Sequence, residues 1–414
     1  MRVVIAGNGV AGVTAARAIR EGRPEDEVQI EVYTAEEWHY YPKPQLIELL
    51  AGRIKPEQAL LYDERWYRER GIAVHLGSPV EEIEPARGEI KLISGKRVGY
   101  DRLLLATGAR AALPEVPGID QEGVFTLRTL ADALRLRERA EAGKSKNKRM
   151  IVLGGGLLGL EAASALASST GLRALVLEKR GWPLSRQLDR QGGELLMKLL
   201  REKGVEVITE AECAAILEGT RGVELELADG RRIAGDFVLV AAGIEPNCAP
   251  ARAAGLEVNR GIIVDERLRT SQPEIYTAGD AAEFQGKVYG IIPAAVEQAR
   301  VAALNIVGEE VTYRGTVPSN ILKVSGLELF SAGEVNPQGE GYKELRLVDE
   351  AHGLYKNLVF KEGRLVGAIL LGTKKNAAQF ARLIATGQDL SGYKEELLAE
   401  DFDFKGLPSQ AGRP

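Results

Sequence analysis

The sequence predicts an α/β protein with two similar nucleotide-binding units and a smaller α+β unit at its C-terminal end. Two apolar strands run into glycine motifs, at Gly7-Asn8-Gly9-Val10-Ala11-Gly12 and at Gly154-Gly155-Gly156-Leu157-Leu158-Gly159. A helical pattern follows each at once, which is the context that the dinucleotide motif G-x-G-x-x-G requires. Each unit later ends a buried strand in small residues, at Ala106-Thr107-Gly108 and at Ala241-Ala242-Gly243. The chain therefore contains two Rossmann-like units of similar build.

Composition restricts the classes of protein to which the chain can belong. Its 414 residues are 45% hydrophobic and 27% charged, which is ordinary for a soluble protein. No apolar run reaches the roughly 18 residues of a membrane helix, and the N-terminus is typical of a strand and not of a secretory signal. Cys213 and Cys248 form no C-x-x-C or zinc pattern, so we expect no metal site. The net charge of −5 does not favour nucleic-acid binding. We expect a cytoplasmic protein.

The first unit opens with a strand over Arg2–Ala6 and a helix that continues through Arg20. The intervening glycines allow a tight turn, and they let a pyrophosphate approach backbone N–H groups at a helix N-terminus. A second strand covers 28–32. Further along, the pattern predicts a helix over 66–73, a strand at 74–76, a hairpin over 89–100 and a buried strand over 101–105.

Acidic residues follow the second strand of this unit. An acid about 20 residues past the glycines can accept hydrogen bonds from an adenosine ribose. We favour Glu36 for this position, with Glu31 and Glu37 as alternatives. Each of the three could equally be an exposed loop acid.

The loop Trp38–Leu46 contains three aromatic residues, Trp38, Tyr40 and Tyr41, and two prolines, which indicates a rigid and partly buried surface. Lys43 stands between Pro42 and Pro44. It could pair with a phosphate or lie beside a cofactor ring, or it could be a solvated lysine on a stiff loop. The loop contains no cysteine.

The second unit follows a linker at Pro114–Gly118 and a charged helix over 130–142. Its strand at 172–177 ends at Glu178, 19 residues past Gly159. A carboxylate there accepts from a free ribose 2′-hydroxyl and repels a 2′-phosphate, which favours NADH over NADPH. Lys179 and Arg180 follow directly, and either could instead meet a phosphate. Further along this unit we expect a helix over 195–202.

The chain then returns to the first unit. An apolar strand within Thr270–Asp280 ends in Gly279-Asp280, where the carboxylate could hold a polyol hydroxyl or cap the next helical segment. A helix over 294–307 follows Pro293, and its N-terminus would favour an electron-rich ring. From about Tyr313 an α+β texture begins. The expected domains are 1–113 with 244–312, 114–243, and 313–414.

These motifs, in this order and spacing, resemble the two-dinucleotide-fold flavoproteins called pyridine nucleotide–disulfide oxidoreductases. Within that family the chain is most similar to NAD(P)H:rubredoxin oxidoreductases and to the flavin module of assimilatory nitrite reductases. The subgroup is matched by the loop Tyr41-Pro42-Lys43-Pro44, by Pro293–Arg300 and by Asn320–Gly326. The resemblance covers the whole chain and implies a glutathione-reductase-like arrangement.

The resemblance implies that the first glycine motif binds FAD and the central one binds NAD(H). It implies that Asp280 holds the flavin ribityl chain, that Glu161 lies at the nicotinamide end, and that Lys43 and the helix after Pro293 flank the isoalloxazine. Glu161 and Lys43 are therefore the candidate catalytic residues. We expect cofactor contacts from Gly7, Gly9, Val10, Ala11, Gly12, Glu36, Lys43, Pro44, Val80, Ala106, Thr107, Gly108, Gly154, Gly156, Leu157, Leu158, Gly159, Glu161, Glu178, Ala242, Gly243, Gly279, Asp280, Pro293 and Glu297.

One departure from the family sharpens the expected activity. Disulfide reductases of this family place a C-x-x-x-x-C pair near the first unit's helix, and related peroxide or coenzyme A disulfide reductases place a single cysteine there. This chain has Tyr40-Tyr41-Pro42-Lys43 and no thiol, so disulfide reduction should be absent.

The remaining expectation is hydride exchange with NADH and single-electron exchange with an iron–sulfur protein. That protein would be a rubredoxin-type carrier or the iron–sulfur subunit of a larger complex, such as an aldehyde oxidoreductase of the tungsten type, and electrons could flow in either direction. The alternatives are an NADH oxidase that uses oxygen and a redox-responsive interaction protein like the apoptosis-inducing factors.

Overall fold

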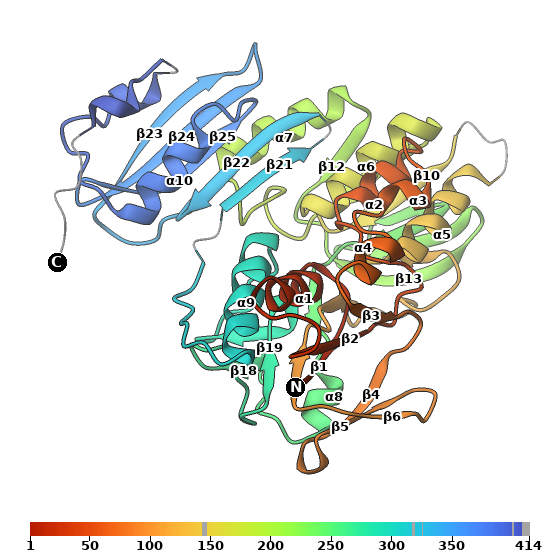
Figure 1. The fold of residues 1–414 in the computed structure, drawn as a ribbon. Helices are drawn as coiled ribbons and strands as arrows, with labels where there is room; N and C mark the ends of the chain where they lie inside the picture. The colour runs from red at the N-terminus through yellow and green to blue at the C-terminus, as the bar shows by residue number, and fades with distance from the viewer. Residues whose placement is uncertain (143–146, 317–318, 325, 400, 408–414) are drawn as a thin grey trace. The chain divides into compact units, whose positions relative to one another are not determined.

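The computed structural model describes residues 1–142, 147–316, 319–324 (as backbone), 326–399 and 401–407. The chain divides into two compact units, which Figure 1 shows as ribbons. Unit 1 comprises Met1–Ala112, Arg128–Ala133 and Ile244–Thr316, and unit 2 comprises Leu113–Leu127, Leu134–Gly243 and Val317–Pro414. The predicted α/β class is confirmed, because each unit contains a five-stranded parallel sheet.

The main sheet of unit 1 has the strand order β19-β7-β1-β2-β3. Its central strand is β1, in which Val3, Val4 and Ile5 are fully buried. A continuous apolar run is what a parallel strand requires when both faces of the sheet are covered. The strands are β1 (Arg2–Ala6), β2 (Gln29–Tyr33), β3 (Ile72–His75), β7 (Arg102–Leu105) and β19 (Ile275–Thr277).

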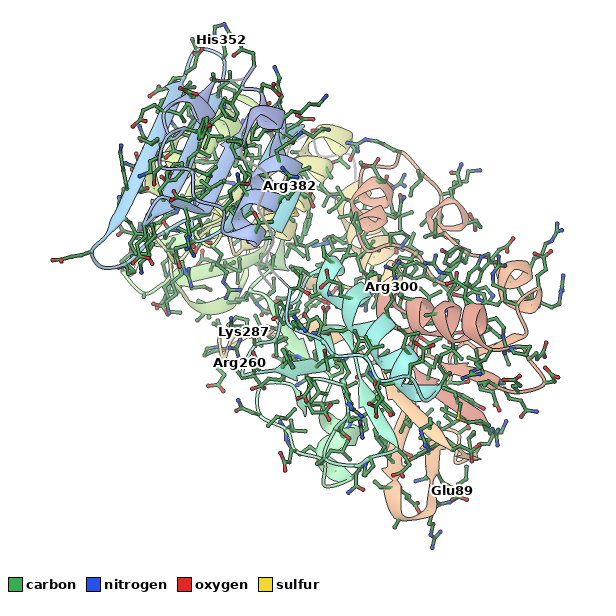
Figure 2. All side chains as sticks on the ribbon, turned by 60° about the vertical axis from the view of Figure 1, so that its left-hand side comes forward. Glu89, Arg260, Lys287, Arg300, His352 and Arg382 are labelled. Atoms are coloured by element: carbon green, nitrogen blue, oxygen red, sulfur yellow. The ribbon has the colours of Figure 1, made fainter. Side chains whose placement is uncertain are left out.

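Two alanine-rich helices pack together on one face of this sheet, α1 (Val10–Gly22) and α9 (Ile292–Ile306), as Figure 1 shows. Ala15 and Ala16 of α1 and Ala299 of α9 are fully buried, and their small side chains let the helices approach closely. Arg300, the next residue of α9, is exposed on its outer side (Figure 2).

Smaller elements complete unit 1. A three-stranded antiparallel sheet carries Glu89 at its outer end (Figure 2), and two strand pairs, β8 with β17 and β18 with β20, connect loops. These elements are α2 (Gln45–Leu50), α3 (Pro56–Ala59), α4 (Glu64–Arg68), α8 (Ala249–Ala253), β4 (Val80–Glu84), β5 (Glu89–Leu92), β6 (Arg97–Gly99), β8 (Ala109–Ala111), β17 (Ile244–Pro246), β18 (Ile262–Val264) and β20 (Ala282–Phe284).

The parallel sheet of unit 2 has the order β9-β16-β10-β11-β12. Its strands β16-β10-β11-β12 repeat the order β7-β1-β2-β3 of unit 1, but the edge strand β9 precedes them in the chain, whereas the edge strand β19 follows its four strands. A three-stranded antiparallel sheet, β13-β14-β15, covers one face through a shared apolar core. The elements are β9 (Val124–Thr126), α5 (Leu130–Glu141, which starts in unit 1), β10 (Arg149–Leu153), α6 (Leu157–Thr170), β11 (Arg173–Leu177), α7 (Arg190–Glu202), β12 (Val205–Ile208), β13 (Cys213–Gly219), β14 (Gly222–Leu227), β15 (Arg232–Gly235) and β16 (Phe237–Val240).

The C-terminal part of unit 2 is an antiparallel sheet of order β21-β22-β25-β24-β23 with one helix packed on it. Phe330, Leu358 and Phe380 form the centre of its core. The elements are β21 (Ser319–Val324), β22 (Leu327–Gly333), β23 (Tyr342–Asp349), β24 (Leu354–Lys361), β25 (Arg364–Leu371) and α10 (Ala377–Thr386). The expected α+β texture is therefore present.

Two sequence predictions of local structure were wrong in their bounds. The helix expected over 66–73 is the shorter α4, which begins where Asp63 accepts a hydrogen bond from the N–H of Trp66 at 2.9 Å and is over before Gly71, whose φ is +56°. β3 then starts at Ile72. The helix expected from 195 begins instead at 190, because Asp189 caps it.

Among the described residues, no helix is both long and apolar enough to cross a membrane.

Candidate functional site

The first glycine loop connects β1 to α1 and lies directly against a neighbouring strand. A Cβ on Gly7 would lie 2.1 Å from the carbonyl oxygen of Ala106, and Gly7 also has a φ of +113°. A Cβ on Gly12 would lie 1.9 Å from the carbonyl oxygen of Gly7. At Gly9, in contrast, a Cβ would meet nothing within 4 Å. The loop is therefore closed toward the sheet and open at Gly9, the N-cap of α1, where a pyrophosphate could approach the backbone.

The second glycine loop repeats this geometry between β10 and α6. Gly154 also has a φ of +113°, and its Cβ would lie 2.5 Å from the carbonyl oxygen of Ala241. A Cβ on Gly159 would lie 2.3 Å from the carbonyl oxygen of Gly154, and Gly156 again faces open space. Leu157 and Leu158 form the first turn of α6, and Ala242 and Gly243 follow β16. The predicted residues of this motif are thus brought together.

Glu178 lies beside the second loop, at the end of β11. Its Oε2 accepts a hydrogen bond from the N–H of Gly155 at 2.8 Å, and its Oε1 accepts one from the N–H of Arg180 at 2.8 Å. The neighbouring cations have partners elsewhere, since Lys179 pairs with Glu212 and the Arg180 guanidinium donates to Ser185 at 3.1 Å. The acid and not a cation therefore faces the glycine loop.

Two candidates of the first unit, Glu36 and Lys43, form an ion pair with each other. The Lys43 ammonium lies 2.8 Å from Glu36 Oε1, and 35% of the lysine side chain is exposed. Tyr41 donates a hydrogen bond to the other oxygen of Glu36 and accepts one from the backbone N–H of Leu130 at 2.9 Å. Burial lowers the pKa of Lys43, and the Glu36 carboxylate opposes this shift. Lys43 is therefore held in a network and is not a freely solvated lysine.

The alternative acids are engaged elsewhere. Glu31 accepts hydrogen bonds from Arg2 and Tyr33, and Glu37 lies against Gly77, whose Cβ would be 2.5 Å from Glu37 Oε1.

Asp280 follows β19 and is ion-paired with an arginine. Its Oδ2 lies 2.5 Å from Nη2 of Arg128, which also donates to the carbonyl oxygen of Ala109 at 2.9 Å. The Asp280 side chain makes no capping hydrogen bond, so the alternative prediction of a helix cap is wrong. Arg128 is not among the residues predicted from the sequence, because nothing local distinguishes it and its partner is 152 residues away.

Two buried amides near these loops have an unpartnered N–H₂ group among the described residues. Asn8 accepts from the Tyr67 hydroxyl at 3.0 Å, and Gln298 accepts from the N–H of Gly279 at 2.9 Å, but Asn8 Nδ2 and Gln298 Nε2 have no acceptor. Gln298 is 1% exposed and Asn8 is 7% exposed. An unpaired buried donor costs about 1–3 kcal/mol, so these groups fit a bound polar cofactor such as FAD.

Thr107, which follows β7, and Asn247, which follows β17, are joined by two reciprocal hydrogen bonds. The Thr107 hydroxyl donates to the Asn247 carbonyl oxygen at 2.9 Å, and the Asn247 side-chain amide donates to the Thr107 carbonyl oxygen at 2.9 Å. Gly108 completes the turn with a φ of +65°. Thr107 therefore has a structural partner, Asn247, which the sequence analysis did not single out.

The remaining candidates lie on elements around these loops. Pro293 is in the first turn of α9, and Glu297 one turn later is exposed and bonded to Thr316. Glu161 is half-buried on α6 in unit 2, and Val80 is half-buried on β4. Val10 and Ala11 begin α1, and Pro44 is the N-cap of α2. The side chains of residues 320–325, part of the matched segment Asn320–Gly326, lie outside the described residues.

Neither cysteine lies on the Trp38–Leu46 loop. Cys248 is 5% exposed at the start of α8, and Cys213 is half-buried in β13. Burial raises the pKa of both thiols, which makes them poor nucleophiles.

Comparison with known families gives two matches that together reach from residue 1 to residue 388. The family described as "Pyridine nucleotide-disulphide oxidoreductase" matches residues 1–339, and the one described as "Rubredoxin NAD+ reductase C-terminal domain" matches residues 318–388.

Individual relatives agree with these matches. The chain is 31% identical to the assimilatory nitrate reductase electron transfer subunit of Bacillus subtilis (strain 168), over 99% of this chain and 52% of that protein. It is 32% identical to the NADH-rubredoxin oxidoreductase of Clostridium acetobutylicum, over 91% of this chain and 94% of that protein. The covalent putidaredoxin reductase–putidaredoxin complex is similar with a TM-score of 0.82 and 28% identity, over 94% of both chains. The chain spans about half the length of the nitrate and nitrite reductase relatives, between 41% and 52%.

Proposed function

The chain belongs to the pyridine nucleotide-disulphide oxidoreductase family, and on this premise we propose that it passes electrons between NADH and an iron–sulfur protein. It is an NAD(P)H-dependent flavoprotein oxidoreductase, and its cofactors are FAD and NAD(H). The observation that carries the proposal is the loop at Tyr41 and Lys43, where an ion pair and a phenol stand instead of a reactive thiol. Without a thiol, electrons leave the protein without a disulfide step.

We assign FAD to unit 1 and NADH to unit 2. The open face of the loop at Gly9 and the unpaired amides of Asn8 and Gln298 support the first assignment. The equivalent opening at Gly156 and the carboxylate of Glu178 support the second. Bound FAD supplies the redox chemistry, accepting a hydride and returning electrons singly.

The protein residues contribute binding and orientation. Asp280, fixed by Arg128, would hold polyol hydroxyls, and Lys43 would bring positive charge to the flavin or its phosphates. Glu161 is proposed at the nicotinamide end of the second site. Holding two reactants in an oriented complex contributes several kcal/mol to lowering a barrier, so no side chain need act as an acid or base.

The proposed partner is a small iron–sulfur protein or the iron–sulfur subunit of a larger complex. The relatives that support this choice are named as an NADH-rubredoxin oxidoreductase, a putidaredoxin reductase bound to putidaredoxin, and an electron transfer subunit of nitrate reductase. The match of residues 318–388 to the rubredoxin reductase C-terminal domain points the same way.

The test is anaerobic mixing of the FAD-loaded protein with NADH, followed by addition of electron acceptors. We expect NADH to bleach the flavin absorbance within seconds, and we expect a rubredoxin or a [2Fe–2S] ferredoxin to restore it faster than air does. Rapid NADH consumption in air without a protein acceptor would instead identify an oxidase. Failure of NADH to bleach the flavin would favour a redox-responsive interaction protein.

A further inference from the structure

A short segment, Arg128–Ala133, belongs to unit 1 although the chain on both sides of it belongs to unit 2. We call this segment the clip. Leu130 and Ala133 are fully buried, and the Asp132 carboxylate accepts hydrogen bonds from the backbone N–H groups of Arg128 and Thr129 at 3.0 and 2.9 Å. The clip, which includes the first residues of α5, therefore has its own internal hydrogen bonds and buried apolar side chains.

Two residues of the clip bond to residues of the proposed FAD site. Arg128 holds Asp280 at 2.5 Å. The backbone N–H of Leu130 donates to the Tyr41 hydroxyl at 2.9 Å, and the same hydroxyl donates to Glu36, which pairs with Lys43 at 2.8 Å. One oxygen atom of Tyr41 thus joins the clip backbone to the ion pair.

The groups that face Lys43 come from two segments, its own loop and the clip. Glu36 and Tyr41 face it from its own loop, and Arg128 and Asp132 face it from the clip. Burial, and then the Glu36 carboxylate, raise the pKa of Tyr41, so the phenol keeps its proton and acts as the donor to Glu36. Since a hydroxyl has one proton, Tyr41 can only accept from Leu130 and from Lys43, whose ammonium lies 3.2 Å away.

We propose that Tyr41 is a positioning residue of the FAD site, whose hydroxyl orients Glu36 toward Lys43 and couples this ion pair to the seating of the clip at Leu130. The inference rests on the FAD assignment proposed above. When the clip leaves its seat, the hydroxyl loses a donor, and the orientation of Glu36 and Lys43 loosens with it. FAD would then meet a less ordered lysine, and binding of FAD would in turn favour the seated clip.

The test compares Tyr41→Phe with Tyr40→Phe, which removes the hydroxyl of an adjacent buried tyrosine that packs near Tyr62 instead. In the full-length apoprotein we would measure two quantities. One is the rate at which acetic anhydride acylates Lys43 at several pH values, read by mass spectrometry. The other is hydrogen exchange of the Leu130 amide. Both should rise about tenfold in Tyr41→Phe, the loss expected for one hydrogen bond, and both should stay at the wild-type value in Tyr40→Phe.

Glu36→Gln separates the two halves of the coupling. It should accelerate acylation of Lys43, because the lysine loses its counter-ion, but leave exchange at Leu130 close to wild type, because the Tyr41 hydroxyl still accepts from the clip. The proposal is overturned if Tyr41→Phe behaves like Tyr40→Phe in both measurements, or if Glu36→Gln loosens the clip as strongly as Tyr41→Phe.

The FAD-loaded protein provides a third measurement. We expect Tyr41→Phe to weaken FAD binding about five- to tenfold, and we expect FAD to slow exchange of the clip in the wild-type protein more than in this variant. If the wild-type chain binds no FAD, the proposed function fails, whereas the apoprotein measurements still decide whether Tyr41 couples Lys43 to the clip.

Discussion

Gly9 and Gly12 stand in one motif, yet an added methyl group should have opposite consequences at the two positions. Gly12 has no room, since its Cβ would lie 1.9 Å from a backbone oxygen, whereas Gly9 has an ordinary φ of −80° and open space around it. Gly12 therefore serves the fold, and Gly9 leaves space for a ligand.

We therefore expect Gly12→Ala to prevent unit 1 from folding stably, and Gly9→Ala to fold normally but to bind FAD at least tenfold more weakly, because its methyl group occupies the ligand's place. Thermal unfolding of the apoprotein and titration with FAD would measure the two effects. Normal FAD binding by Gly9→Ala would contradict the assignment of this loop. Gly156→Ala in unit 2 is the matched control, since it should spare FAD and weaken NADH.

A second prediction concerns Glu178. Replacing it with Gln removes the negative charge and one of the two acceptor oxygens that serve Gly155 and Arg180. We expect the KM for NADH to rise about tenfold and the preference for NADH over NADPH to shrink by a similar factor. Steady-state kinetics with both nucleotides would measure this. Glu212→Gln, which frees Lys179 without touching the loop, is the control, and an unchanged preference in Glu178→Gln would contradict the role of this acid.

For single residues, the sequence predicted positions correctly where a motif has a fixed spacing along the chain. The glycines and Glu178 stand at fixed distances from a strand, so the pattern alone located them. Arg128 was missed, and Tyr41 was quoted as part of its loop but given no role, because their partners, Asp280 and Leu130, lie 152 and 89 residues away in sequence. Only the folded chain brings such pairs together.

Among the elements, the parallel pair β18 and β20 is supported by one buried carboxylate. Glu283 is 3% exposed and accepts from the N–H of Gly261 at 2.8 Å and from Asn259 at 2.9 Å. Burial alone would raise the pKa of Glu283, but these hydrogen bonds outweigh it and hold the pKa below the ordinary 4.5.

Because this pKa is lowered by folding, the stabilisation from Glu283 is fully present above pH 4.5 and is lost as the pH falls through the folded value. We expect Glu283→Gln to unfold about 1–3 kcal/mol more easily than wild type at pH 7, and the difference to shrink as the pH falls below 4.5. Urea titrations at pH 7 and at low pH would measure this. A difference that grows in acid would contradict the sign.

Helix α7 begins at a buried carboxylate, the N-cap Asp189. Asp189 is 6% exposed and accepts from the N–H of Gly192 at 2.9 Å, from the Asn357 amide at 2.9 Å and from the Tyr355 hydroxyl. The carboxylate thus bonds the helix to strand β24 of the C-terminal sheet. A cap that bonded only its own helix would contribute much less to the free energy of unfolding.

We expect Asp189→Ala to destabilise unit 2 by about 3 kcal/mol or more, because a cap is lost and two buried donors are left unpaired. Asp63→Ala removes an exposed cap from α4 and should cost only about 1 kcal/mol. Trp182, which packs on Gly193 of α7, would report the unfolding of unit 2, and Trp66 of α4 would report that of unit 1, each in a chain whose other tryptophans are replaced by phenylalanine. Equal effects of the two substitutions in urea unfolding would contradict the role of the β24 contacts.

The sequence predicted most elements correctly because their apolar periodicity is strong. It misplaced the start of α7 because Gly192 and Gly193 interrupt the helical pattern, while the deciding contacts of Asp189 come from β24. It overextended α4 because the end before Gly71 depends on backbone conformation and not on hydropathy.

At the scale of the whole molecule, four strands of each parallel sheet follow the same order, and in both units a glycine after the first of them lies close to the neighbouring strand. The sequence predicted two units of similar build and an α+β region from about Tyr313. It did not predict that Arg128–Ala133 would join unit 1, because six residues without a motif carry no periodic signal.

The absence of a thiol from the loop Trp38–Leu46 leads to a prediction about removal of the cysteines. We expect the double variant Cys213→Ser with Cys248→Ala to keep NADH-dependent reduction of ferricyanide within about twofold of wild type, since neither thiol is placed or charged for chemistry. A large loss in a folded, FAD-loaded variant would contradict electron transfer without a thiol. The wild-type protein should likewise fail to reduce glutathione disulfide.

The position of β19 also orders events during synthesis. All five strands of the unit 2 parallel sheet lie between Val124 and Val240, whereas the unit 1 sheet waits for Ile275–Thr277 to form its last strand. A ribosome therefore delivers a complete sheet for the later unit while the earlier one still lacks an edge, reversing the usual order in which N-terminal domains fold first. Until β19 emerges, β7 presents an open edge, and a chaperone that binds the nascent chain at this stage of translation would protect that edge from aggregation.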